Sequence, residues 1–172
     1  IYRVELVAQK VENIFVLDPV TRKIREEVKE MMLFPARHFV TLRDELKDAI
    51  QNIRAELRGR LKYFEKTGKL LEAERVERRV KYDLEMIEQI GFCHGIENYS
   101  RPLSGRAQGV PPDTLLNYFP EDFLMVIDES HVTVPQLGGM YEGDAARKKT
   151  LIEYGFRLPS AADNRPLKFN EF

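Results

Sequence analysis

The sequence has little of several features that would assign a protein class at once. Its 172 residues include one cysteine, Cys93, so no disulfide can form within the chain, and a single thiol suits a reducing compartment such as the cytoplasm. No apolar run approaches the roughly 18–20 residues of a membrane span, and no signal peptide is visible. The formal net charge of −1 excludes a uniformly basic nucleic-acid binder. We expect a globular cytoplasmic protein without a membrane partner.

A phosphate-binding loop is also missing. The pattern G-x-x-x-x-G-K-[ST], whose backbone N–H groups hold nucleotide phosphates, occurs nowhere in the chain. The sequence starts at Ile1, without an initiator methionine, directly in an alternating strand pattern. We therefore expect an internal stretch of a longer protein, in which other residues would complete any nucleotide site.

The strongest local signal lies in the last third of the chain. The apolar run 124–127 is followed by the tetrad Asp128-Glu129-Ser130-His131. The run predicts a strand over 122–128, buried on both faces as in a parallel sheet. An acid at the carboxyl end of such a strand can hold Mg²⁺ through water beside a nucleotide, and a second acid can polarise the attacking water. The alternative is a pair of ordinary strand-end acids.

Helical spacing dominates the middle of the chain. Apolar residues recur at intervals of three and four over 42–66 and again over 69–90, with a turn at Gly68 between the two segments. Two long helices joined in this way form an antiparallel hairpin. A further helix is expected over 145–154, beyond an interruption at Pro135.

The first 34 residues alternate between apolar and polar side chains. This pattern predicts the end of a small antiparallel β module. Arg3 and Glu5 would lie on an exposed face of its first strand. They are either solvated charges or part of a docking face for another protein.

Two further segments allow a structural and a functional interpretation. In the loop 91–100, Phe92 and Tyr99 could fill the core, or they could form a wall against which a nucleic-acid base stacks. A zinc site at Cys93 and His94 is not expected, because no second pair follows at zinc spacing. The second helix carries a basic cluster that is either solvated surface or close to a nucleic-acid backbone. This cluster consists of Arg75, Arg78, Arg79 and Lys81.

Several ordered blocks together resemble bacterial UvrB, the damage-verifying subunit of the UvrABC nucleotide excision repair system. The tetrad Asp128-Glu129-Ser130-His131 resembles motif II of superfamily 2 helicases. The blocks that carry the resemblance are Phe34 to Thr41, Gly68 to Ala73, Tyr82 to Met86, Gly91 to Ser100, Asp128 to Gly139 and Tyr154 to Ala161. One departure stands at the turn between the first two strands, where the family usually has Gly-Asp-Glu and this chain has Ala8-Gln9-Lys10.

The resemblance implies a mixed α/β fold in three parts. Residues 1–38 would be the end of a β-rich domain that binds UvrA. Residues 39–110 would be a mainly helical insertion containing the long hairpin. Residues 111–172 would be part of a RecA-like P-loop motor domain carrying motif II.

The resemblance also implies roles for individual residues. Glu129 would be the catalytic carboxylate and Asp128 the acid associated with Mg²⁺, while His131 would couple nucleotide state to DNA contacts. In the loop, Phe92 and Glu97 would line the DNA path, and Tyr99 belongs to the same aromatic wall. Arg3 and Glu5 would contact UvrA.

At the level of the whole protein, the resemblance implies a DNA-stimulated ATPase that UvrA loads onto damaged DNA and that recruits UvrC through segments absent from this chain. ATP and Mg²⁺ would be its cofactors, although we expect this stretch alone to bind neither and to be inactive. Two alternatives remain at this stage. The chain could be a protein-interaction scaffold without nucleotide chemistry, or a module of a transcription-repair coupling factor.

Overall fold

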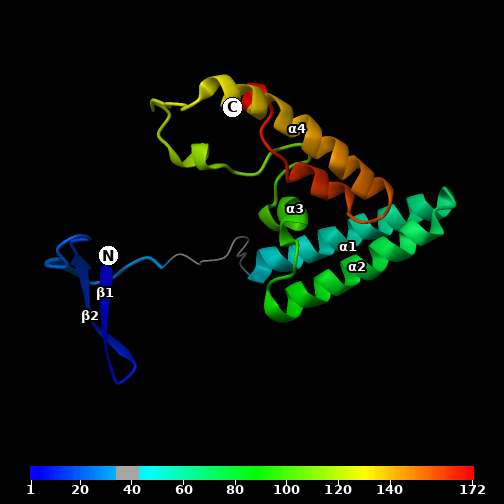
Figure 1. Ribbon diagram of the computed structural model, residues 1–172. Helices are drawn as coiled ribbons and strands as arrows, with labels where there is room; N and C mark the ends of the chain where they lie inside the picture. The colour runs from blue at the N-terminus through cyan, green and yellow to red at the C-terminus, as the bar shows by residue number, and fades with distance from the viewer. Residues whose placement is uncertain (34–42) are drawn as a thin grey trace. The chain divides into compact units, whose positions relative to one another are not determined.

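The computed structural model describes residues 1–33 and 43–172, which belong to two compact units (Figure 1). The first unit comprises Ile1–His38 and the second Phe39–Phe172. The sequence block from Phe34 to Thr41 lies outside the described residues. Each unit is described separately below.

The first unit contains a three-stranded antiparallel sheet, which confirms the predicted β module. Its strands are β1 (Tyr2–Val7), β2 (Lys10–Leu17) and β3 (Ile24–Val28), with β2 in the centre. The central strand supplies the buried apolar side chains of the sheet, Ile14 and Leu17, each 8% exposed. Because β2 has a neighbouring strand along each edge, it is the most covered of the three.

The turn between β1 and β2 combines an unfavourable sequence with a tight geometry. Ala8 and Gln9 both have positive φ, 48° and 69°, as a two-residue type I′ turn requires. Residues with a Cβ pay for this conformation, whereas Asn-Gly is the preferred pair. We therefore expect the double variant Ala8→Asn, Gln9→Gly to stabilise the sheet by about 1 kcal/mol, measured by chemical unfolding. Glu27→Gly, which places glycine inside exposed β3, should lower stability, and equal shifts for both variants would contradict this account.

The second unit is built on the predicted helical hairpin. Helix α1 covers Arg43–Lys66 and helix α2 covers Leu70–Ile90, so both predicted helices are confirmed to within a residue. Gly91 ends α2 in the left-handed conformation at φ 76°, and its N–H donates to the carbonyl of Ile87. The facing apolar stripes form one core with the loop that follows α2. Its fully covered members include Ile53, Phe64, Val76, Val80, Ile87 and Cys93.

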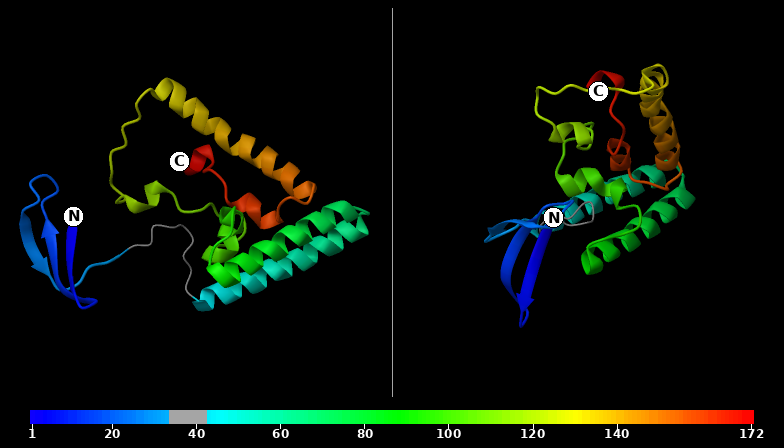
Figure 2. Two further views of the ribbon diagram at one scale, coloured as in Figure 1. Left: turned by 60° about the horizontal axis from the view of Figure 1, so that its bottom comes forward. Right: turned by 60° about the vertical axis from the view of Figure 1, so that its left-hand side comes forward.

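Short elements connect the hairpin to the rest of the unit. They are the 3₁₀ turns η1 (Ile96–Tyr99), η2 (Leu115–Tyr118), η3 (Pro159–Asp163) and η4 (Phe169–Glu171), with helices α3 (Ser100–Ser104) and α4 (Ser130–Glu153). Helix α3 contacts α1, and η3 contacts both α3 and α4, as the two views of Figure 2 show. The segment around η3 is therefore the place where the end of the chain meets the hairpin.

The strand predicted over 122–128 is wrong for this structure. Residues 123–127 have no regular secondary structure and belong to no sheet, and Leu124 and Val126 are 89% and 84% exposed. A parallel strand needs neighbours on both sides for its N–H and C=O groups. Within residues 43–172 the structure contains no strand that could serve, so the apolar run remains unpaired. The RecA-like sheet is accordingly not seen in the described residues, and the observed fold is helices with one small antiparallel sheet.

Helix α4 also differs from its prediction, because it begins at Ser130 and passes through Pro135. The N–H groups of Val132 and Thr133 both donate to the carbonyl of Glu129, at 2.9 and 3.0 Å, and start the helix before the proline. The proline ring removes one N–H, but it fixes φ near a helical value. The proline therefore removes one backbone hydrogen bond without ending the helix. None of the helices in the described ranges is long and apolar enough to cross a membrane.

Candidate functional site

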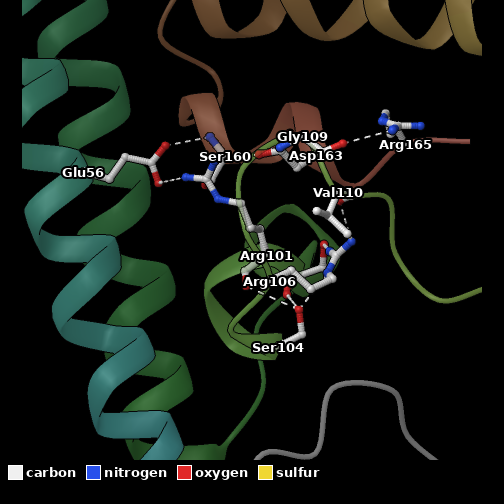
Figure 3. Close-up of polar contacts among 10 residues, drawn as sticks. Glu56, Arg101, Ser104, Arg106, Gly109, Val110, Ser160, Asp163 and Arg165 are labelled. Carbon is white, nitrogen blue, oxygen red and sulfur yellow. Dashed lines mark hydrogen bonds and ion pairs between the residues drawn. The ribbon is translucent and has the colours of Figure 1, made fainter.

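A network of charged side chains fixes the end of the chain to the hairpin (Figure 3). Glu56 of α1 accepts the N–H of Ser160 at 2.6 Å, and Arg101 of α3 lies 3.8 Å from the same carboxylate. Arg101 also donates to Asp163 at 2.6 Å, and the other Asp163 oxygen accepts the N–H of Gly109 at 3.0 Å. These side chains are mostly covered, so their pairing restricts how η3 can sit on the helices.

The predicted catalytic acids lie together at the start of α4. Asp128 accepts the N–H of Glu129 at 2.9 Å, and Glu129 adopts φ 49° at the residue preceding the helix. His131 Nδ1 is 3.3 Å from a Glu129 carboxylate oxygen, and both side chains are more than two-thirds exposed. Carboxylates near a helix N-terminus are stabilised by its dipole. The structure thus brings Asp128, Glu129 and His131 to one exposed corner.

Few side chains that could bind a metal ion lie at this corner. In the described part of the chain, no group of three or more His, Cys, Asp or Glu side chains is placed to hold a metal ion. Mg²⁺ usually binds through one or two carboxylates and completes its shell with water and substrate phosphates. Asp128 and Glu129 thus offer two carboxylates, a number that suffices for Mg²⁺ only where water or phosphate oxygens complete its shell.

The loop after α2 separates into a buried and an exposed part. Tyr99 is only 4% exposed, and its hydroxyl donates to Asp83 at 2.7 Å. A base cannot stack on this ring in the structure, so Tyr99 follows the core alternative. Phe92 is half-buried against the same core, while Glu97 is exposed. Of the three predicted DNA contacts, Glu97 and part of Phe92 are accessible.

Burial also controls the titration of this loop. Burial, followed by the nearby Asp83 carboxylate, raises the pKa of Cys93 to about 12. Burial and the hydrogen bond to Asp83 raise the pKa of Tyr99 as well. Both groups are therefore neutral at physiological pH, and Cys93 is a core residue rather than a nucleophile.

The predicted docking residues lie side by side on the sheet of the first unit. Arg3 and Glu5 form an ion pair of 3.2 Å, and both side chains are nearly half exposed. Arg3 also lies over the Phe15 ring at 5.0 Å, and Asn13 donates to Glu5 at 3.4 Å. The charges are thus held in place on an accessible face, available to a partner.

A basic pocket lies between α2 and the loop after α4. The sequence indicated only part of its lining. We call this cavity of about 380 Å³ the arginine pocket, and it is lined by Arg75, Arg78, Arg79, Tyr82, Phe156 and Arg157. Lys81, which the sequence grouped with these arginines, instead pairs with Glu77 at 2.7 Å. Phe156 and Arg157 are remote in sequence from α2, so no local pattern could have added them.

Comparison with known proteins agrees with this organisation. The family model for the UvrB interaction domain matches residues 1–39, and the model for the UvrB third helical domain matches residues 44–105. Similar curated proteins include UvrABC system protein B of Carboxydothermus hydrogenoformans, 57% identical, of Thermobifida fusca, 58%, and of Francisella tularensis, 56%. Each alignment covers 99% of this chain and 24–26% of the relative. The chain therefore spans about a quarter of the length of these relatives.

Proposed function

Since this chain belongs to the UvrB family, we propose that it forms part of a protein that verifies DNA damage in bacterial nucleotide excision repair, using ATP. The observation that carries this proposal is the match of both described units to UvrB sequences, at 56–58% identity over 170 residues. Identity of this extent supports a shared fold and a shared role for the whole stretch.

The proposed division of labour follows the two units. The charged face of the sheet, with Arg3 and Glu5, docks UvrA, which loads the protein onto DNA. The exposed corner at α4 serves the nucleotide, with Glu129 polarising the attacking water, Asp128 reaching Mg²⁺ through water, and His131 relaying nucleotide state. The accessible loop residues Phe92 and Glu97 line the path of the DNA.

Three elements of the proposal lie beyond this stretch of chain. The phosphate loop for ATP would come from other parts of the protein, and neighbouring strands would cover the exposed apolar run 123–127. UvrC would be recruited through other segments.

The cytoplasm, where bacterial DNA is repaired, is the proposed location.

A chimeric protein tests this function. The 170 residues of the Carboxydothermus hydrogenoformans relative that align with this chain would be replaced by it, and the chimera expressed in a bacterium lacking its own UvrB gene. We expect survival after ultraviolet irradiation to be restored. The same chimera with Phe64→Asp, which puts a charge at a side chain with no exposed area, should not restore it. A folded chimera that binds UvrA but leaves the cells fully sensitive would favour a scaffold without nucleotide chemistry.

A further inference from the structure

The arginine pocket differs in charge from the rest of the hairpin surface. Four of its six lining side chains are arginines, and none is acidic. A second groove on the hairpin, by contrast, mixes Arg54, Arg58 and Lys81 with three glutamates. Because the whole chain has a formal charge of −1, an anion would be drawn to such a local patch rather than to the protein as a whole.

The guanidinium groups of the pocket are held in position while most of their donors remain unused. Arg79 donates through Nε to Asp83 at 2.8 Å and through one terminal nitrogen to the His94 carbonyl at 2.6 Å. Arg157 donates through Nε to Asn98 at 3.0 Å and through one terminal nitrogen to the Phe156 carbonyl at 2.9 Å. A guanidinium has five N–H donors, so each keeps donors for a ligand. Arg78 is exposed and has no partner among the described residues.

Two aromatic rings complete the pocket. Tyr82 and Phe156 are 57% and 45% exposed, so part of each ring is accessible to a ligand. The guanidinium of Arg75 lies 4.3 Å from the centre of the Phe156 ring and covers one side of it. The pocket therefore combines planar cations, which match phosphate oxygens, with exposed rings that a flat group can cover.

We infer that the arginine pocket binds single-stranded DNA, with the arginines on the phosphodiester backbone and an unpaired base against Phe156 or Tyr82. Duplex DNA offers the same phosphates but keeps its bases stacked, so only a single strand uses both features. The pocket also adjoins the loop 92–99 through Arg79 and Arg157. This inference rests on the proposed role in DNA inspection, and it names a contact site for the strand.

Binding of a fluorescein-labelled oligothymidine of about 12 nucleotides to the chain tests the inference by fluorescence anisotropy. We expect Arg78→Glu to weaken binding about tenfold and to reduce the slope of log K against log salt by about 0.7. The matched control is Arg58→Glu, an exposed arginine on the other groove of the same hairpin with the same change in charge. Thermal unfolding establishes that both variants are folded.

A second pair of measurements addresses the base. Phe156→Leu should weaken oligothymidine about fivefold and an abasic oligonucleotide of the same length less than twofold. The inference would be overturned if Phe156→Leu weakened the binding of both oligonucleotides equally, or if Arg78→Glu and Arg58→Glu had equal effects. It would also be overturned if polyglutamate, at a concentration equal to that of the DNA, displaced the DNA. These assays need no ATP, so the pocket can bind DNA even where the chimera fails in repair. Failure of this inference and failure of the proposed function are therefore distinguishable.

Discussion

Replacing Glu129 by alanine in the repair-competent chimera is expected to reduce ATP turnover by about 10²–10⁴-fold, the usual contribution of a positioned general base. The carboxylate is exposed and paired with His131 at the start of α4, so its removal deletes no core contact. The loss should therefore appear in kcat for ATP, measured by phosphate release in the presence of DNA, with UvrA binding and the unfolding temperature unchanged.

Glu142→Ala is the matched control for this substitution. Glu142 is an exposed acid on the same helix, and its removal changes the net charge equally. We expect turnover within about twofold of the unsubstituted chimera, as for most surface substitutions. Turnover that survives Glu129→Ala would contradict the assignment of the acid pair, whatever the outcome of DNA binding.

The second large effect is expected at Gly155, where the loop after α4 approaches the first turn of α2. A Cβ at this position would lie 2.3 Å from the carbonyl oxygen of Glu72 and 2.8 Å from its Cα. The contacted atoms are backbone, so neither can rotate away. Gly155 also has φ 72°, a conformation that side chains rarely adopt. We expect Gly155→Ala to cost about 2–5 kcal/mol, combining strain with overpacking.

Gly91→Ala separates these two contributions. Gly91 has nearly the same φ, 76°, but a Cβ there would meet nothing within 4 Å. It should therefore cost only the strain, about 1–2 kcal/mol. Chemical unfolding of the two variants gives the difference, and hydrogen exchange should show the loss of protection in the 155–165 segment for Gly155→Ala alone. Equal destabilisation would mean that the close approach to α2 does not occur in solution.

Prediction from sequence succeeded where the signal was periodic and local. The apolar stripes of α1 and α2 recur at helical spacing, and glycines at 68 and 91 mark where each helix stops. The alternation in the first 17 residues similarly indicated β1 and β2. In the two helices, the residues that set the periodicity are also the ones that become buried, so the pattern carries the information by itself.

The acid tetrad shows the opposite situation. Its motif was recognisable, and the structure places Asp128, Glu129 and His131 together. The strand that should precede it did not form, because hydrogen bonds in a sheet come from neighbours that the local pattern does not contain. Tyr99 was ambiguous for a related reason, since only the packing of its loop onto the helical hairpin decided that its ring is buried.

The amino-acid order alone determined the helical hairpin, the small antiparallel sheet and the family to which the chain belongs. Only the tertiary structure decided that Phe156 and Arg157 join the arginines of α2, and that Glu56, Arg101 and Asp163 hold the last segment onto the helices. The physical reason is the range of the interactions: periodicity reports which face of an element is apolar, whereas long-range contacts depend on how separately formed elements pack.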